Sequence, residues 1–307
     1  MTTEAEIVAR LRELFPRTGD DAAVIGDQVI TVDMLVEDVD FTRSVPLRFI
    51  ARKSLAVNLS DLAAMGAQPR YAVVALGLPP WVNVNMLTDA LAEAAREHEI
   101  EIVGGDLSRA EKLIIAITAI GEAKQPLLRS GARAGDRIYV SRPLGGAAAG
   151  LAFLGKPLDD MPYALREFAQ SAVQRQIDPE PEVELGMKLV GIATSCIDIS
   201  DGLSTDLGHL CEASGVGAEV SRERIPVFPG LIESGLNVRD AVLNGGEEYA
   251  LLFTSRLRES EISTRVGRPV YAIGRMVEGL GVRIDGEPLP PRGWDHFAAE
   301  NGVRSKV

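Results

Sequence analysis

The sequence has little of what disulfide frameworks, nucleophilic triads or membrane anchors require. Only two of its 307 residues are cysteine, too few for a disulfide framework, and both stand in apolar runs that predict buried thiols. The three histidines lie far apart in the sequence, and no Gly-x-Ser-x-Gly motif accompanies them. No apolar run reaches 18 residues, and no amino-terminal leader pattern is present. We therefore expect a cytoplasmic protein and find little support for nucleophilic catalysis.

Clusters of basic residues are also missing. Lysine and arginine together number 32 against 44 acidic residues, which gives a formal net charge of −12. A surface of this kind repels nucleic acid and anionic membranes, so we expect neither as a partner. It also repels phosphorylated metabolites unless cations bridge them to the carboxylates. The acidic balance thus fits a metal-dependent site, although a well-solvated protein without such a site would show it too.

Strand and helix signals predict an α/β (α+β) protein with two domains. In the first half, β-branched and apolar runs predict strands at 28–36, 71–78, 100–104 and 112–121, with helices at 47–65 and 84–98. This order predicts helices that cover one sheet. A glycine-rich, charged segment at 129–136 marks a boundary, and we assign the domains to residues 1–134 and 135–307.

No repeat of 20–50 residues is visible in the sequence, and the second half has its own set of expected elements. Small-residue-rich and helical stretches are expected at 145–154, 162–175, 181–190 and 203–214. Strands are expected at 137–141, 194–199, 217–221, 249–254, 269–274 and 280–284. The tail after Phe297 is expected to fray.

What the sequence does contain is aspartate at the edges of apolar or glycine-containing runs. There are five such motifs, none with Lys or Arg beside the acid: Gly19-Asp20-Asp21, Thr31-Val32-Asp33, Asn58-Leu59-Ser60-Asp61, Gly104-Gly105-Asp106 and Asp198-Ile199-Ser200-Asp201. Acids at the ends of buried strands are costly unless they are paired or bind metal. Carboxylate oxygens suit Mg²⁺, which usually works together with a substrate phosphate. The pattern predicts one acidic, metal-filled site.

Several of these acids also have a simple structural explanation. Asp201 falls where a helix N-cap is expected, and the glycines of the 104–106 motif could form a tight turn at the end of a strand. Capping does not explain Asp198, which follows apolar residues inside a strand, or Asp33, which interrupts an apolar run. The segment 244–249 fits a turn and a substrate-contacting loop about equally well.

Taken in order, the motifs resemble those of thiamine-monophosphate kinases. The matching segments are GDDAA (19–23), VDMLVEDVDF (32–41), KSLAVNLSDLAAMGA (53–67), GGD (104–106), RSGARAGDRIYVS (129–141), IDISDGLSTDLGH (197–209), NGGEEY (244–249) and GWDHF (293–297). The resemblance implies the two-domain fold of the aminoimidazole-ribonucleotide synthetase-like group. It further implies a homodimer in which the amino-terminal sheet pairs with its twin, and ATP in the cleft between the domains.

The resemblance also implies roles for individual residues. The implied Mg²⁺ ligands are Asp21, Asp33, Asp61, Asp106, Asp198 and Asp201, with Asp20 and Thr31 as further candidates. The implied ATP contacts are Gly105, Asp106, Arg129 and Ser200, and the catalytic set is Asp33, Asp106, Arg129 and Asp201. Glu247 and Trp294 would contact thiamine phosphate. Asp40 stands where the family usually has histidine; an acid there would meet the cationic thiazolium or a metal-bridged phosphate.

The implied reaction is direct transfer of the γ-phosphoryl group of ATP to thiamine phosphate. The acceptor is itself a phosphate with a second pKa of about 6, so it is mostly a dianion at neutral pH and needs no general base. Charge neutralisation and in-line alignment are what such a reaction requires, and Mg²⁺ with an arginine supplies both. The alternatives are another ATP-using member of the same group, such as aminoimidazole-ribonucleotide synthetase, and a non-catalytic nucleotide- or thiamine-phosphate-binding protein.

Overall fold

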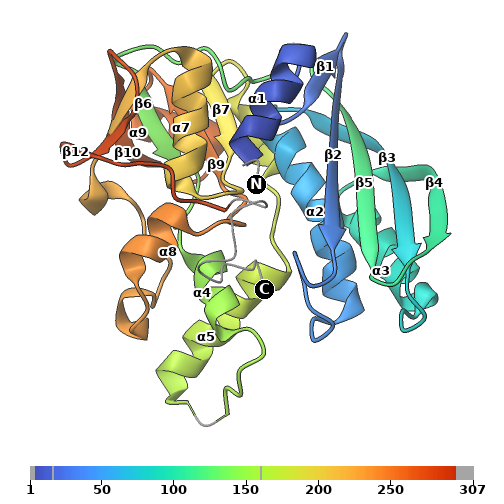
Figure 1. The fold of residues 1–307 in the computed structure, drawn as a ribbon. Helices are drawn as coiled ribbons and strands as arrows, with labels where there is room; N and C mark the ends of the chain where they lie inside the picture. The colour runs from blue at the N-terminus through green and yellow to red at the C-terminus, as the bar shows by residue number, and fades with distance from the viewer. Residues whose placement is uncertain (1–3, 16, 160, 295–307) are drawn as a thin grey trace.

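The computed structural model describes residues 4–15, 17–159 and 161–294, which form two units built around separate sheets (Figure 1). The first unit contains α1 (Glu4–Leu14), β1 (Ala23–Ile25), β2 (Gln28–Val36), α2 (Leu47–Ala64), β3 (Gln68–Leu78), α3 (Val84–Glu97), β4 (Glu101–Arg109) and β5 (Ile114–Glu122). Its strands lie in the order β1-β2-β5-β3-β4, and only the β3–β4 pair is parallel. The α2 and α3 helices pack against the apolar face of this sheet.

The second unit begins with β6 (Arg137–Val140). Its helices are α4 (Gly146–Phe153), α5 (Tyr163–Ile177), α6 (Val183–Leu189), α7 (Leu203–Ser214), α8 (Val238–Asn244) and α9 (Glu259–Val266). Its other strands are β7 (Ser195–Asp198), β8 (Gly217–Val220), β9 (Leu251–Ser255), β10 (Tyr271–Val277), β11 (Val282–Ile284) and β12 (Glu287–Pro288), and the sheet order is β12-β11-β8-β10-β6-β9-β7. Two short 3₁₀ turns, Arg222–Arg224 and Ile232–Ser234, complete it.

The α2 helix joins the two units. Leu55, Leu59 and Leu62, which helical spacing predicts on one face, are fully buried in the core of the first unit. On other sides α2 contacts α6 and β7 of the second unit, and Ala63 and Ala64 belong to a shared apolar cluster there. Because the helix is enclosed on several sides, its polar residues Ser54, Asn58 and Ser60 are buried.

Most of the predicted elements are confirmed, and two of the differences are instructive. The strand expected at 100–104 continues to Arg109, because the 104–106 motif pairs with β3 rather than turning. A Cβ on Gly105 would lie 1.9 Å from the Val74 carbonyl oxygen, so glycine allows this close pairing. The strand expected from 249 begins only at Leu251, because Tyr249 has a left-handed backbone with φ of 47°. The tail after Phe297 lies outside the described residues.

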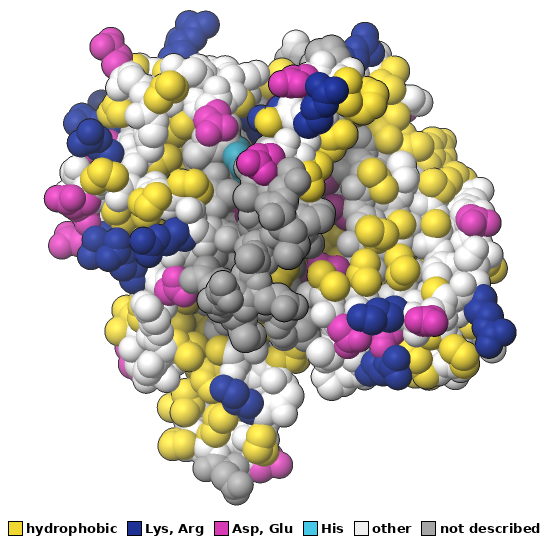
Figure 2. Space-filling view, viewed as in Figure 1, with side chains coloured by type: hydrophobic (Ala, Val, Ile, Leu, Met, Phe, Trp, Pro, Cys, Tyr) yellow, Lys and Arg dark blue, Asp and Glu magenta, His cyan; other side chains and the backbone are white. Residues whose placement is uncertain are grey.

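The outer face of the first sheet is apolar and open. Val32 and Met34 on β2, with Tyr71 and Val73 on β3, are each more than a third exposed. Figure 2 shows hydrophobic side chains gathered over this part of the molecule. Over the described ranges, no helix is long and apolar enough to cross a membrane.

Candidate active site

Three aspartates far apart in the sequence meet at the junction of the two units. Asp21 precedes β1, Asp61 lies on α2, and Asp198 ends β7. One carboxylate oxygen of each lies within 4.8 Å of the others. The sequence predicts all three as members of one site, and the structure brings them together. Because Asp198 belongs to the second sheet, this aspartate cluster spans both units.

Polar residues of α2, namely Asn58, Ser60 and Asp61, build one wall of the cluster. The Thr31 hydroxyl on β2 donates a hydrogen bond to Asp61, and the Ser60 hydroxyl donates to Asp198 across the junction. Asn58 accepts the backbone N–H of Asp33 at 3.0 Å and donates to a carbonyl of its own helix. These bonds fix the acids along the inner edge of β2 and α2. Thr31 and Asp33 thus stand beside the cluster, as the motifs predict.

The electrostatics of the cluster favour a cation. Burial, followed by the charges of Asp33 and Asp198, raises the pKa of Asp61 well above its usual range. Burial and then the charge of Asp21 raise the pKa of Asp198 to about 8. Oδ2 of Asp21 is buried and has no hydrogen-bond partner among the described residues. Crowded carboxylates with an unsatisfied oxygen fit a hard divalent cation such as Mg²⁺.

Arg129 supplies positive charge beside the cluster. Its guanidinium donates to Asp21, with Nη2 2.7 Å from Oδ1, and its backbone N–H donates to the Asp20 carboxylate at 2.7 Å. Burial works against the charged form, but the nearby Asp21 carboxylate outweighs it and raises the pKa of Arg129. The arginine thus remains a cation, placed to meet an anionic ligand at this junction.

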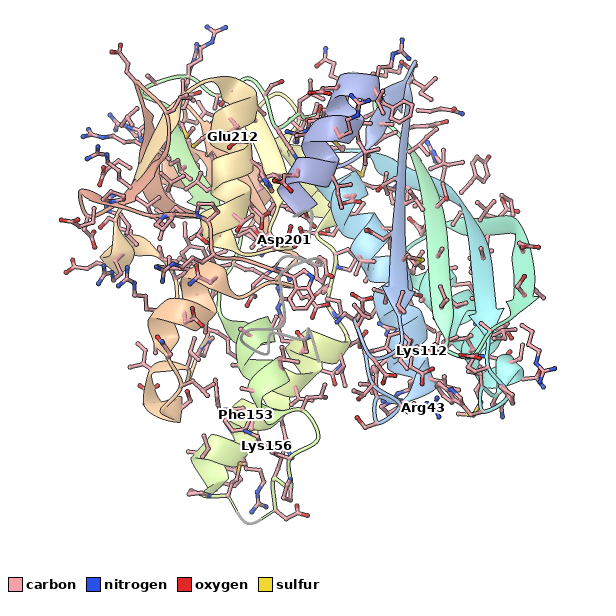
Figure 3. All side chains as sticks on the ribbon, in the orientation of Figure 1. Arg43, Lys112, Phe153, Lys156, Asp201 and Glu212 are labelled. Carbon is pink, nitrogen blue, oxygen red and sulfur yellow. The ribbon has the colours of Figure 1, made fainter. Side chains whose placement is uncertain are left out.

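The connection from β7 to α7 differs from the expectation that Asp201 caps the helix. Gly202 occupies the N-cap position with φ of 115°, and a Cβ there would lie 2.9 Å from backbone atoms of Asn244. The Asp206 carboxylate accepts the backbone N–H groups of Asp201 and Gly202 at 3.1 and 3.0 Å. Asp206 thus closes the turn, and Asp201 stands at the start of α7 on the side toward α1 and α2 (Figure 3).

The segment 244–250 packs directly against this connection. The backbone N–H of Glu247 donates to the Ser200 carbonyl at 2.7 Å, and that of Tyr249 donates to the Ile199 carbonyl at 2.8 Å. Glu247 and Tyr249 have φ of 61° and 47°, values that non-glycine residues rarely adopt. Such strain persists where the surroundings enforce it, and it is common at functional sites. The observation favours a functional loop over a simple turn.

The expected substrate contacts lie around the same junction. The backbone N–H of Trp294 donates to the Asp201 carbonyl at 3.1 Å. Asp40 is buried, and its carboxylate accepts the backbone N–H of Val36 at 2.8 Å, which closes the turn after β2. Glu247 is buried and paired with Lys53, a residue to which the sequence analysis assigns no role. Asp40, Lys53 and Gln176 line one small, mostly apolar cavity.

Gly105 and Asp106 are not brought to the cluster within one chain. Asp106 pairs with Ala75, which pairs with Ala116, which pairs with Met34, so Asp106 belongs to the open face of the sheet. Asp33 lies on β2 with its side chain on the opposite face from Met34. Three strand spacings of roughly 4.8 Å separate β4 from β2, or about 14 Å.

Comparison with known proteins identifies the family and the fold. Models of the AIR synthase related proteins match the chain twice, with the N-terminal domain at residues 19–123 and the C-terminal domain at residues 133–287. The thiamine-monophosphate kinase of Salmonella typhimurium is 37% identical over 302 residues, which cover 91% of either chain. The chain belongs to the thiamine-monophosphate kinase family. The predicted two-domain fold and the predicted enzyme class, a kinase that acts on thiamine phosphate, are confirmed.

Solved structures of this family share the whole fold. The thiamine monophosphate kinase of Aquifex aeolicus is 30% identical with a TM-score of 0.85, covering 94% of this chain and 98% of that one. A structure described as AaThiL complexed with AMPPCP and TMP is 31% identical with a TM-score of 0.88, covering 96% and 97%. That protein therefore holds AMPPCP and TMP on a framework like this one.

Proposed function

We propose that this kinase transfers the γ-phosphoryl group of ATP directly to the phosphate of thiamine phosphate, giving thiamine diphosphate and ADP with the help of several Mg²⁺ ions. The observation that carries the proposal is the aspartate cluster of Asp21, Asp61 and Asp198, with its unsatisfied Asp21 oxygen, at the junction of the two units. A protein that only bound a nucleotide or thiamine phosphate would need fewer metal ligands than the cluster and the acids beside it supply.

The residues around the cluster would share the work. Asp33 and Asp201, with Asp20 and Thr31 as additional candidates, would join the cluster in holding Mg²⁺. The bound Mg²⁺ would neutralise the charge that builds up between two phosphate groups. Arg129 would exchange part of its pairing with Asp21 for the phosphates of ATP, with Ser200 beside it. Since the acceptor phosphate is mostly a dianion at neutral pH, no side chain has to remove a proton from it.

The substrate would be oriented by groups on both units. Trp294 is anchored to the backbone of Asp201 and would present an aromatic surface to the rings of thiamine phosphate. Glu247 and Asp40 would place negative charge near the cationic thiazolium. Asp40 already accepts a backbone N–H, and a carboxylate has lone pairs left for a second partner.

A homodimer would explain the position of Asp106. The open apolar face of the first sheet suits a second copy of the chain, because a monomer rarely exposes such a surface. Pairing of two such faces would bring β4 of one chain toward β2 of the other. Gly105 and Asp106 would then complete the site of the partner rather than their own.

A turnover assay tests this function. The purified protein is incubated with ATP, Mg²⁺ and thiamine phosphate, and thiamine diphosphate and ADP are quantified. We expect the two products in equal amounts, and we expect Asp201→Asn to abolish turnover without loss of the fold. Binding without product would favour the non-catalytic alternative, and preferential use of a purine precursor would favour a synthetase of the same group.

A further inference from the structure

A buried ion pair connects the two units beside the expected substrate residues. Nζ of Lys53, on α2, lies 2.7 Å from Oε1 of Glu247, in the loop before β9. The two side chains are only 5% and 4% exposed. The side-chain amide of Gln176, on α5, donates to the other oxygen of Glu247. Both carboxylate oxygens of Glu247 are therefore held from outside its own loop.

The pair matters because neither partner can be buried alone. A buried charge that loses its partner is strongly destabilised, and it moves toward water or changes its protonation. Glu247 also carries a left-handed backbone with φ of 61°, which persists only when its surroundings enforce it. Lys53 and Gln176 hold the side chain of Glu247, and the Ser200 carbonyl accepts a hydrogen bond from its backbone N–H.

The loop that carries Glu247 adjoins the connection between Asp198 and Asp201. The N–H of Glu247 bonds to the Ser200 carbonyl, and Ser200 lies between Asp198 and Asp201. Lys53 also lines the cavity that contains Asp40. Lys53 thus fixes Glu247, which is one proposed substrate contact, and it lines the same cavity as Asp40, which is another.

We infer that Lys53 is a positioning residue for thiamine phosphate, which acts through Glu247 by fixing the direction and charge of its carboxylate across the junction of the two units. The inference rests on the proposed function, in which Glu247 contacts this substrate. It does not require Lys53 to touch either substrate. It predicts an effect on the affinity for thiamine phosphate that is larger than the effect on ATP.

Steady-state kinetics of a double-mutant cycle test the inference. The variants are Lys53→Met, Glu247→Gln and the double variant, and Lys112→Met is the matched control because Lys112 forms an exposed pair with Asp38, well away from Asp201 (Figure 3). We expect Lys53→Met to raise KM for thiamine phosphate about 10- to 100-fold while KM for ATP changes little. In the Glu247→Gln background the same substitution should have no further effect.

The outcomes separate the inference from the proposed function. Either single variant leaves one charge buried alone, whereas the double variant removes both charges and is expected to fold even if a single variant does not. An unchanged KM for thiamine phosphate in the double variant would then overturn the inference. If KM for thiamine phosphate is higher in the double variant than in Glu247→Gln, or unchanged in folded Lys53→Met, the inference is overturned. If the unaltered protein forms no thiamine diphosphate, the proposed function fails first and the inference fails with it.

Discussion

Replacing Asp61 by asparagine should stabilise the metal-free protein and remove its response to Mg²⁺. The change keeps the size of the side chain, and the asparagine oxygen can still accept the hydrogen bond that Thr31 donates. It removes one negative charge from the aspartate cluster. The structure thus predicts opposite effects on stability and on function from a single substitution.

The magnitude follows from the spacing of the carboxylates. Two unit charges 4.8 Å apart, the largest separation within the cluster, repel by about 3.5 kcal/mol at an effective dielectric constant of about 20. The raised pKa of Asp61, caused by burial and then by Asp33, means that protonation already relieves part of this repulsion. We therefore expect a gain of about 1–2 kcal/mol, or about 2–8 °C in melting temperature.

Thermal melts with EDTA and with Mg²⁺ measure both effects. The unaltered protein should melt higher in Mg²⁺ because ligand binding stabilises the folded state. Asp61→Asn should melt higher than the unaltered protein in EDTA and gain little from Mg²⁺. Asp89→Asn, which removes an exposed charge from α3, should follow the unaltered protein in both conditions. The reasoning is refuted if Asp61→Asn melts no higher than the unaltered protein in EDTA, or if Mg²⁺ raises its melting temperature as much as it does that of the unaltered protein.

Three further substitutions test other parts of the structure. Met34→Glu on the open sheet face should convert a dimer to monomers in sedimentation velocity, and a mass unchanged by the substitution would count against that interface. Gly105→Ala should cost about 3 kcal/mol or more in denaturant unfolding because its Cβ would meet β3 backbone, whereas Gly208→Ala has open space and should cost nothing. Burial and then Arg129 lower the pKa of His209 to about 4, so stability should fall as the pH drops from about 6.5 toward 4. His209→Gln should reduce this loss of stability at acid pH. An unchanged dependence of stability on pH in that variant would contradict the role given to His209.

Part of the aspartate cluster, and Asp33 beside it, could be predicted from the sequence because these acids stand out locally. Asp33 and Asp198 interrupt apolar strands, and the spacing of Ser54, Asn58 and Asp61 marks a polar stripe on a buried helix. An acid in such a place needs a partner or a metal whatever the tertiary structure is. The face of α2 that packs into the core is likewise predictable, because Leu55, Leu59 and Leu62 recur at helical spacing.

The remaining features depend on contacts between distant segments. Nothing near Lys53 in the sequence points to Glu247, and the pairing arises only when α2 docks against the second unit. The role of Asp206 in closing the turn at Asp201 depends on a left-handed glycine between them. The helices α1, α8 and α9 were not predicted; α8 and α9 have only 7 and 8 residues, and short amphipathic segments resemble loops in pattern.

The most direct test of the central claim is a crystal structure of the protein grown with Mn²⁺ and a non-hydrolysable ATP analogue, with anomalous scattering used to locate the metal. We expect an anomalous peak between Asp21, Asp61 and Asp198, in contact with oxygen atoms of both units. A bound nucleotide with no metal at these three carboxylates, or with metal only elsewhere, would contradict it.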